Sequence, residues 1–520
     1  MDAAAVADEI RRQFAGPFDA KREPPPITNV FEEPVLGERL FGLSAKLKGL
    51  GSAPVSAARR TRKRLSDDEE LIAFLVTLDE HLETIDAHLD VNRARTANLG
   101  TTIAATLAAR RIAKDRAKIL ASLAHQLRRA WHHIRALEGT KQLQPVRRAL
   151  WRSLFTDDPV AFLRWFADRP GDSRLATTPV FLEGETGTGK SMIASCLARS
   201  SYVNLVTAHD GDVGRLFVSV NLAGLAPSIV ESELFGHVKG AFTGATEDKA
   251  GLLETVGEHG ILFLDEIAAA PVHLQVKLLD ALERRAVRRV GDLVERPFRG
   301  RLVVAANESP ESLVESGRMR EDFFYRICSV RITIPPLRSI WKDDGVKLAH
   351  LFAARLFVGD DLASRPAHTL SEDQQGFVAR MEPNYLRLCT KVDEALRRRG
   401  ADTDPWRGNV RELRQLVAAV YVGVDPPARM PGSSARLPDG GALEALERAA
   451  FALGREGPLE RGVVAGGHRK VKHAVMRELV RGIRERPNGR SDNEAAKLAG
   501  ANVKTIRELG RGERRQSNRR

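Results

Sequence analysis

Residues 179–200 read PVFLEGETGTGKSMIASCLARS, and this stretch decides the fold. An apolar run leads into a glycine-rich loop, and a helical pattern begins directly after the loop. In this context backbone N–H groups and the helix N-terminus surround phosphates, so the pattern predicts a nucleotide-binding P-loop. Lys190 would reach the β- and γ-phosphates, and Ser191 would be a ligand of Mg²⁺. We expect ATP to be bound by the loop residues Gly184, Glu185, Thr186, Gly187, Thr188, Gly189, Lys190 and Ser191.

Two later strands carry polar residues at their ends. Residues 261–266 read ILFLDE, in which Asp265 is expected to support Mg²⁺ and Glu266 to polarise the attacking water. A further apolar strand over 301–305 is followed by Asn307. In P-loop ATPases of the AAA+ type a polar residue at this strand end senses the γ-phosphate. Because such short strands alternate with helical stretches, we predict a covered parallel sheet of the α/β class.

The composition limits the kind of protein this is. The chain has 520 residues, 43% of them hydrophobic, which allows roughly three or four domains of about 150 residues. No apolar run approaches the ~20 residues that span a bilayer, and the first residues have no export signal. Cys196, Cys328 and Cys389 are far apart and form no metal-type pair. We expect a cytoplasmic protein that does not bind membranes.

The region before the P-loop has a helical pattern. One apolar stripe follows spacings of three and four and consists of Leu71, Leu75, Leu78, Leu82, Ile85 and Leu89. A second helical stretch is expected over 101–137, so the two predict a helical hairpin or a short coiled coil that could dimerise. His and carboxylate residues within 79–90 are possible metal ligands. A solvated polar face opposite the stripe is the favoured interpretation, and we predict no metal there.

The segment 240–245 reads GAFTGA. Small residues surround Phe242 and Thr243, which suits neither a helix nor a core strand, and an exposed aromatic residue between glycines indicates a contact loop. An ordinary turn is the simpler interpretation of a generic glycine pair. However, this hexapeptide closely resembles the signature loop of the sigma-54-dependent transcriptional activators, also called bacterial enhancer-binding proteins, and the resemblance extends over about residues 179–424.

The resemblance implies a set of contacts and roles. In that family the loop rises from an AAA+ ring and contacts sigma-54. The expected contact residues here are Gly240, Ala241, Phe242, Thr243, Gly244 and Ala245. Asn221 resembles the asparagine that couples the catalytic glutamate to the nucleotide state. The segment 317–326 resembles the subunit-boundary motif, which would make Arg320 and Arg326 arginine fingers that enter a neighbouring site. Arg411, in the segment 406–413, resembles the second sensor of the helical lid.

Some positions depart from the family pattern. Arg407 stands where the family usually has proline, and Ala306 stands where a threonine precedes the sensor asparagine. Leu222 and Ala223 replace Cys-Ala after the switch asparagine. The segment before the P-loop and the longer lid are also atypical. These departures concern the regulation of hydrolysis, since every core catalytic residue is present.

The C-terminal stretch is basic. The net charge of the chain is +13, and residues 455–520 contain 18 Lys or Arg against 8 Asp or Glu. Residues 491–509 read as helix, glycine turn and helix, with Ser491 and Glu494 as a capping box. The pattern predicts a helix-turn-helix that binds double-stranded DNA, although a plain helical hairpin is the alternative. The residues expected to face the DNA are Lys504, Thr505 and Arg507.

Together these features predict an α/β AAA+ P-loop ATPase core with a helical lid, a helical N-terminal region and a C-terminal all-α helix-turn-helix domain. We divide the chain into an irregular leader, a helical regulatory region of unknown input, an α/β ATPase subdomain, a helical lid, a linker with a short helix and a DNA-binding domain. Their expected ranges are 1–65, 66–150, 151–336, 337–424, 425–470 and 471–520.

The predicted function is an ATP-dependent activator that binds enhancer-like upstream DNA and remodels sigma-54 RNA polymerase holoenzyme. The resemblance implies a homo-oligomer, most simply a hexamer, with ATP between subunits and Mg²⁺ as its partner ion. Two alternatives stay open. One is an AAA+ remodelling ATPase with another client, which the GAFTGA loop disfavours. The other is a DNA-binding regulator that does not hydrolyse ATP, which the intact Lys190, Asp265 and Glu266 disfavour.

Overall fold

The computed structural model of the 520-residue chain describes residues 65, 67–86, 93–135, 137, 141–156, 162, 165–166, 178–202, 217–257, 259–363 and 372–424. It divides into two compact units, with the boundary between Pro336 and Leu337 in the described part of the chain. The predictions for 1–64 and for 425–520, including the helix-turn-helix, lie outside the described residues. Each unit is described by itself.

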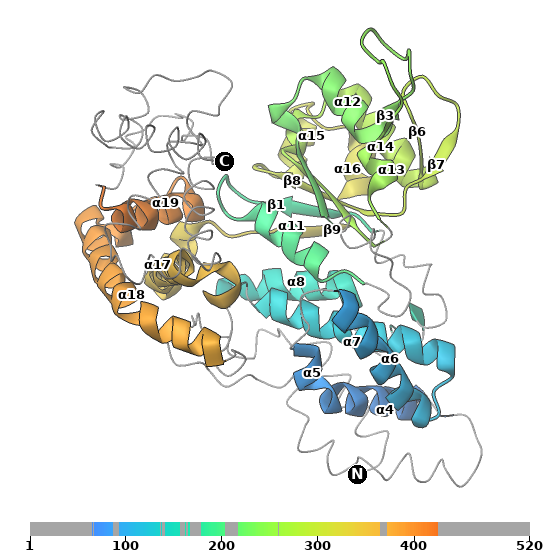
Figure 1. Ribbon diagram of the computed structural model, residues 1–520. Coiled ribbons are helices and arrows are strands. Elements are labelled where there is room, and N and C mark those ends of the chain that lie inside the picture. The colour runs from blue at the N-terminus through green and yellow to red at the C-terminus, as the bar shows by residue number, and fades with distance from the viewer. Residues whose placement is uncertain are drawn as a thin grey trace, which may run out of the picture. The chain divides into compact units, whose positions relative to one another are not determined.

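The first unit is built around a five-stranded parallel sheet (Figure 1). Its strand order is β2-β5-β8-β1-β9, so every connection between sequential strands crosses over and every strand runs in the same direction. The bounds are β1 Val180–Glu183, β2 Phe217–Asn221, β5 Ile261–Asp265, β8 Arg301–Ala306 and β9 Val330–Thr333. The predicted α/β class with a parallel sheet is confirmed.

Alternating side chains of the strands face two separate hydrophobic cores. In β5, Ile261 and Phe263 face one core, while Leu262 and Leu264 face the other, and all four are at most 1% exposed. A period of two is what a strand covered on both faces requires. The sheet is therefore the middle layer of three.

One face of the sheet is covered by helices that lie between β2 and β9 in the chain. These are α12 Pro227–Phe235, α13 Leu252–Thr255, α14 Val272–Arg284, α15 Pro310–Glu315 and α16 Glu321–Ile327, with the short 3₁₀ turns η4 Leu222–Gly224 and η5 Ile267–Ala269. Two short antiparallel pairs belong to the same side: β3 Gly236–His237 with β4 Lys249–Ala250, and β6 Ala286–Arg288 with β7 Glu295–Pro297.

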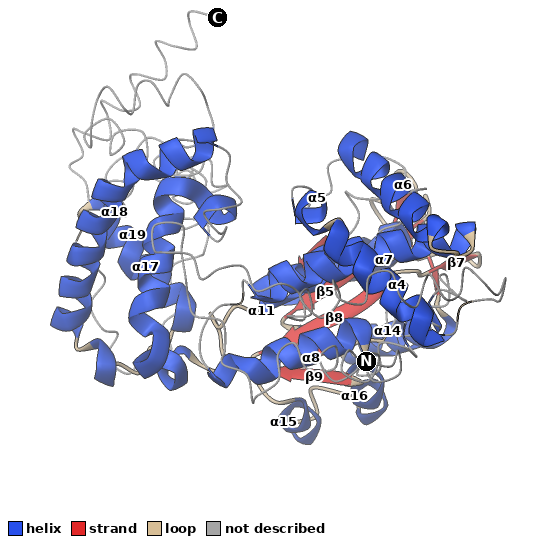
Figure 2. Ribbon diagram, turned by 90° about the horizontal axis from the view of Figure 1, so that it is seen from below, coloured by secondary structure: helices blue, strands red, loops and turns tan. Residues whose placement is uncertain are grey.

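The other face is covered by α11 Lys190–Arg199 together with the N-terminal helices (Figure 2). The N-terminal elements are α4 Asp67–Glu80, α5 Leu82–Asp86, α6 Arg93–Ala109, α7 Lys114–Arg135, η2 Lys141–Leu143 and α8 Gln144–Phe155. Their apolar side chains and those of the sheet form one continuous core. The N-terminal helices are thus part of the same compact unit as the sheet.

The single long helix expected over 101–137 is wrong in detail. The chain is helical up to Ala109 and again from Lys114, and the four residues between them form a break. Arg111 has φ 69° there, and the Ile112 N–H donates to the Leu107 carbonyl at 3.3 Å, which closes the helix end. Four residues of the expected stripe, Leu71, Leu75, Leu78 and Ile85, are at most 3% exposed, whereas Leu82 is only partly buried and Leu89 lies outside the described residues.

The second unit is helical over its described range. It contains α17 Leu337–Ala363, which is kinked at Gly359, then α18 Glu372–Arg399, η7 Ala401–Thr403 and α19 Asn409–Val422. The Trp341 and Trp406 rings stack at 4.6 Å between centroids in its core. Asn409 is fully buried, and its side-chain Oδ1 accepts from the Leu337 N–H at 2.8 Å. Among the described residues of both units, no helix combines the length and apolar character that a bilayer crossing needs.

Candidate nucleotide site and contact loop

The P-loop connects β1 to α11 in the predicted context. Gly187 and Gly189 have φ of 81° and 101°, which glycine adopts without the strain that a Cβ would cause. A Cβ on Gly184 would lie 2.9 Å from the Thr188 Oγ1 and 3.0 Å from the Ile334 carbonyl oxygen, so the first glycine is also required by space. The loop leads directly into α11, whose first residue is Lys190. This arrangement directs backbone N–H groups and a helix N-terminus to one place.

Lys190 is the charged centre of this loop and is only 7% exposed. Its Nζ donates to the carbonyl oxygens of Gly184 at 2.7 Å and Glu185 at 3.0 Å, and to Oδ1 of Asn307 at 2.6 Å. The two predicted residues Lys190 and Asn307 are therefore in contact although 117 positions separate them. A buried ammonium held by oxygens on one side of a glycine loop is suited to a phosphate.

The sheet topology explains why these residues meet. β8 lies between β1 and β5, so Asn307, directly after β8, falls between the P-loop after β1 and Asp265 at the end of β5. Because the carboxyl ends of parallel strands share one edge of the sheet, residues from distant segments collect there. Asn221 belongs to the same edge, since it pairs with Asp265 in the β2–β5 register.

The two carboxylates at the end of β5 differ in conformation. Asp265 is the last strand residue, and its Oδ1 accepts from the Glu266 N–H at 3.0 Å. Glu266 has φ 56° and ψ 50°, in the left-handed region that is unfavourable for a residue with a long side chain. Such strain costs of order 1 kcal/mol and is typical of functional positions, where it aims a side chain in a fixed direction.

The carboxylate and hydroxyl oxygens available here suit Mg²⁺, which takes hard oxygen ligands. Ser191 is exposed at the start of α11, and Asp265 is partly exposed at the end of β5. Within the described ranges no cluster of three or more His, Cys, Asp or Glu residues could hold a metal by itself. The donor set therefore fits an ion that is bound together with phosphate oxygens and water.

Asn221 does not contact Glu266 in this structure. Its Oδ1 caps the turn η4 by accepting from the Ala223 N–H at 3.0 Å. The departure from the family pattern lies in this turn, where Leu222 is 3% exposed and packs into the core on that face of the sheet. Ala306 is the buried last residue of β8, where it packs into the same core.

The two candidate arginine fingers lie at the two ends of α16. Arg320 precedes the helix, and its Nη2 lies 2.7 Å from Oδ2 of Asp322, an ion pair whose partners are both exposed. Arg326 lies in the last turn, where its Nη2 donates to the Leu282 carbonyl at 2.7 Å. Both side chains are exposed overall. An arginine finger acts on the nucleotide of a neighbouring subunit. The structure contains a single chain, so the finger role stays a prediction.

Sequence reasoning missed Gln275, which holds the segment of Arg320 in place. This residue of α14 is 1% exposed, and its Nε2 donates to the carbonyls of Ala270 at 2.9 Å and Arg318 at 2.8 Å. Its Oε1 accepts from the Arg320 N–H at 2.9 Å. The only signal for it in the sequence is a polar residue within the apolar pattern VHLQVKLL.

The GAFTGA segment forms a closed loop between β3 and β4. The Gly240 N–H donates to the Ala245 carbonyl at 2.9 Å, and the Ala245 N–H donates to the Phe242 carbonyl at 3.0 Å. Gly240 and Gly244 have φ of 82° and 101°, which the turn requires. Phe242 is 45% exposed and Thr243 is exposed, whereas Ala245 is buried. The loop thus presents the phenyl and hydroxyl groups to solvent, as expected for a contact loop.

The base of this loop rests on the β6–β7 hairpin. The Val238 N–H donates to the Val290 carbonyl at 3.1 Å, and the Val290 N–H donates to the Gly236 carbonyl at 2.9 Å. A Cβ on Gly291 would lie 2.8 Å from the Ala241 Cβ, so the two segments are in close contact. Leu293 in the hairpin is 87% exposed, the largest exposed fraction among the exposed apolar residues described. Sequence reasoning did not identify this hairpin.

Other predicted site residues lie elsewhere. Arg411 is an exposed residue of α19 in the second unit, so the single unit that holds the P-loop does not contain it. Arg407 lies two residues before α19. Lys504, Thr505 and Arg507 lie outside the described residues.

Residues 170–333 match the family described as "Sigma-54 interaction domain". The chain is 37% identical over 259 residues to the response regulator protein PilR of Pseudomonas aeruginosa, and the match covers 50% of each chain. It is 35% identical over 265 residues to the C4-dicarboxylate transport transcriptional regulatory protein DctD of Rhizobium meliloti, again covering 50% of each. Among solved structures, NtrX from Brucella abortus is 21% identical with a TM-score of 0.36, and the match covers 78% of this chain and 79% of that one.

The chain spans about half the length of the curated relatives it matches. The matched range begins before the P-loop and ends with β9, so it includes the whole parallel sheet and the GAFTGA loop. The chain therefore carries a sigma-54 interaction domain with an AAA+-like P-loop α/β core, and the resemblance inferred from the motifs is confirmed.

Proposed function

We propose that this chain, which carries a sigma-54 interaction domain, is a transcription activator that binds and hydrolyses ATP to remodel sigma-54 RNA polymerase holoenzyme. The observation that carries the proposal is a single sheet edge at which Lys190, Asn307 and the Asp265-Glu266 pair collect. The exposed GAFTGA loop lies in the same compact unit as this edge.

In this mechanism the P-loop amides and Lys190 hold the phosphates of ATP, with Ser191 and Asp265 as the protein ligands of Mg²⁺. The bound ion would neutralise charge on the phosphates. Glu266 orients and polarises the attacking water, since a carboxylate held in a fixed conformation can accept its proton. Asn307 contacts Lys190 and reports the γ-phosphate position to β8.

A single chain leaves this site incomplete, so we propose an oligomer, most simply a hexameric ring. Arg320 and Arg326 are exposed at the two ends of a short helix and are free to reach a neighbouring subunit's nucleotide once their local contacts exchange. Arginine fingers stabilise charge on the transferring phosphate and contribute ~10³–10⁵ in rate. Arg411 would complete the site from the helical lid.

ATP hydrolysis would be coupled to the client through the segment of Asn221 and the GAFTGA loop that follows it in the chain. Asn221 pairs in register with Asp265 and is followed by the turn that leads into α12, after which β3 and the GAFTGA loop begin. A change in the Asn221 contact on hydrolysis would therefore shift the base of the loop. Residues 471–520 would anchor the ring to enhancer-like DNA through Lys504, Thr505 and Arg507.

The test is open-complex formation on a sigma-54 promoter, with ATP hydrolysis measured in parallel. Thr243→Ala should hydrolyse ATP normally and fail to open the promoter, because the loop presents the hydroxyl to solvent and not to the nucleotide. Glu266→Gln should bind ATP and fail in both assays. If the wild type hydrolyses ATP and never opens the promoter, the client is another protein. Open complexes formed at full rate by Glu266→Gln would exclude a motor.

A further inference from the structure

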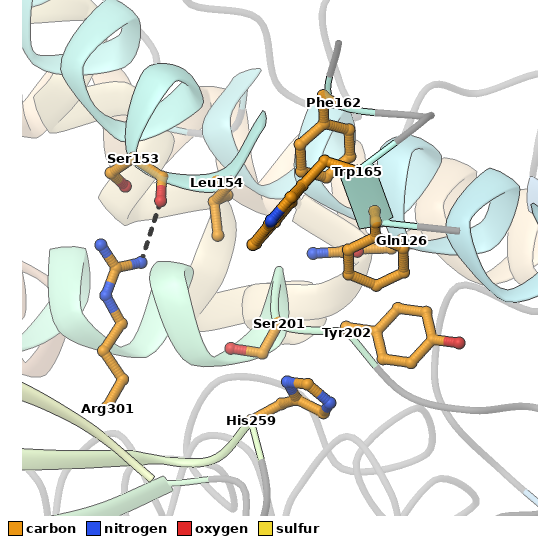
Figure 3. A pocket seen from close by; sticks show the side chains of 10 residues that line it. Gln126, Ser153, Leu154, Phe162, Trp165, Ser201, Tyr202, His259 and Arg301 are labelled. Atoms are coloured by element: carbon orange, nitrogen blue, oxygen red, sulfur yellow. Dashed lines mark hydrogen bonds between the residues drawn. The ribbon is translucent and has the colours of Figure 1, made fainter. Parts of the chain in front are cut away.

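A small internal cavity of about 30 Å³ lies at the amino-terminal ends of the sheet strands (Figure 3). Its walls come from both the N-terminal helices and the ATPase core: Gln126 from α7, Leu154 from α8, Tyr202 after α11, His259 before β5 and Arg301 at the start of β8. It is unrelated to the nucleotide site, which occupies the opposite edge of the sheet. A volume of this size holds about two water molecules or one small planar ion.

Arg301 brings a positive charge to this cavity. The side chain is 3% exposed, and its Nε donates to the Thr178 carbonyl at 2.6 Å and its Nη1 to the Ser153 carbonyl at 3.1 Å. Its Nη2 has no hydrogen-bond partner among the described residues. Burial lowers the pKa of Arg301 to about 10, so the group remains a cation at neutral pH. Buried cations are normally paired with an anion, because desolvation is costly.

The described residues that line the cavity supply no counter-charge for this cation. None of the ten described residues that line it is acidic. Burial raises the pKa of Tyr202 to about 12, so the phenol is neutral as well. The carbonyl of Ser153 lies in the last turn of α8, where a helix end supplies only about half a negative charge. The region is therefore electrostatically complementary to a small anion.

A second buried polar atom in the cavity wall also lacks a partner. Gln126 is 5% exposed, and its Nε2 donates to the Ser200 carbonyl at 3.1 Å, whereas its Oε1 has no partner among the described residues. The indole of Trp165 and the rings of Phe162 and Phe166 cover the rest of the wall, as Figure 3 shows for the first two. These rings form the apolar side of the cavity, away from the Arg301 guanidinium (Figure 3).

Three elements connect this cavity to the nucleotide edge. α11 begins at Lys190 and ends just before Tyr202, while β8 begins at Arg301 and ends just before Asn307. β5 likewise extends from Ile261, two residues after the lining residue His259, to Asp265. Close-packed strands and helices transmit displacements along their length, since interiors are nearly incompressible. An occupant of the cavity would therefore contact Arg301 at the start of β8, together with Tyr202 just after α11 and His259 just before β5.

We propose that this cavity is an effector site for a small planar oxyanion, of the size of formate or hydrogencarbonate, with Arg301 as its counter-charge. The site gives the N-terminal helices a role as the sensing half of the protein, with the ATPase sheet as the responding half. Binding of the anion stands independently of any activity, whereas the effector role rests on the proposed ATP hydrolysis.

The test titrates the full chain with sodium formate and, separately, with sodium hydrogencarbonate, by calorimetry and by tryptophan fluorescence. Sodium chloride at equal ionic strength is the control. Saturable binding of at least one planar anion and not of chloride is expected. Trp165→Phe should remove the fluorescence change and keep the heat of binding, which places the anion beside that indole. No saturable signal up to about 50 mM would mean that the cavity holds ordered water only and would overturn the proposal.

Two variants distinguish the contribution of the Arg301 charge from that of the cavity volume. Arg301→Met should abolish binding, and Leu154→Phe, which narrows the cavity and keeps the charge, should weaken it at least about tenfold. Arg285→Met is the matched control, because Arg285 also has a buried nitrogen without a partner but does not line the cavity. If Arg301→Met does not fold, Leu154→Phe and the wild-type titrations decide. Equal binding by wild type and Leu154→Phe would exclude this cavity as the site.

The effector role is tested by measuring the rate of ATP hydrolysis with and without the anion. Saturating anion should change the ATPase rate of the wild type at least about twofold and leave the rate of Leu154→Phe unchanged. Binding with an unaltered ATPase rate would overturn the effector role. Binding by a protein that never hydrolyses ATP would overturn the proposed function, and the effector role with it, while the anion site itself would stand.

Discussion

The two edges of the parallel sheet are built in different ways. At the carboxyl edge, Lys190 contacts Asn307 and Glu266 follows the neighbouring strand β5. The backbone takes left-handed conformations there at Gly187, Gly189 and Glu266. At the amino edge, helices from the preceding region close over the strands and continue their hydrophobic core. The comparison shows that the predicted nucleotide residues lie at one edge, whereas apolar packing between the N-terminal helices and the strands dominates the other.

The largest expected effect is a loss of stability caused by a substitution at the amino edge. Trp151 in α8 is 1% exposed and packs on Phe155 with 4.6 Å between ring centroids. Trp151→Ala should lower the free energy of unfolding of the first unit by about 3–5 kcal/mol, because a large cavity replaces the indole. Denaturant unfolding followed by circular dichroism measures it. Tyr325→Ala, at a site 69% exposed, is the control. A loss below about 1 kcal/mol would show that the N-terminal helices are not structurally joined to the sheet.

The next effect is on the rate of ATP hydrolysis and comes from a substitution at the carboxyl edge. Lys190→Ala removes the ammonium that contacts two P-loop carbonyls and Asn307, so ATP hydrolysis should fall at least about 10²-fold. The measurement is phosphate release at saturating ATP, with Lys249→Ala as a lysine control far from the P-loop in sequence. Hydrolysis within threefold of wild type would mean that this edge is not the catalytic one.

A smaller effect is expected at Gln275, which links α14 to the finger segment. Gln275→Leu leaves two carbonyls and the Arg320 N–H without their partner, at a cost of about 1–3 kcal/mol in stability. The ATPase rate should fall while the affinity for ATP is kept, because Arg320 acts on a neighbouring site. Val276→Ala, at the next and 44% exposed position, is the matched control. Equal ATPase rates in both variants would argue against a positioning role for Gln275.

The smallest expected effect is a pH dependence of stability that comes from the ion pair of Arg289 and Glu254. A hydrogen bond from Arg289 lowers the pKa of Glu254 from its ordinary value, with atoms 2.8 and 2.9 Å apart. Because the folded pKa is depressed, this pair stabilises the protein above about pH 4.5 and the contribution is lost as the pH falls through the folded pKa. Glu254→Gln should cost about 0.5 kcal/mol at pH 7 and less at pH 3. The measurement is thermal unfolding at both pH values, and a pH-independent difference would contradict it.

The motifs of the carboxyl edge could be predicted from the sequence because each of them is a local pattern. A glycine loop between a strand and a helix, or a carboxylate pair after an apolar strand, fixes its own conformation within a few residues. The break at 110–113 was not predictable in this way, since apolar spacing continues through it and only the closed helix end shows it. Gln275 was missed because its three partners come from separate segments.

The sequence by itself therefore determined the α/β class and the glycine-rich P-loop, and it predicted the nucleotide residues and the GAFTGA contact loop. The tertiary structure decided which residues touch. It brought Lys190 to Asn307, placed the β6–β7 hairpin under the GAFTGA loop and joined the N-terminal helices to the amino edge around Arg301. The physical reason is that motifs are set by local backbone geometry, whereas packing and buried charge depend on contacts between segments that are far apart in the chain.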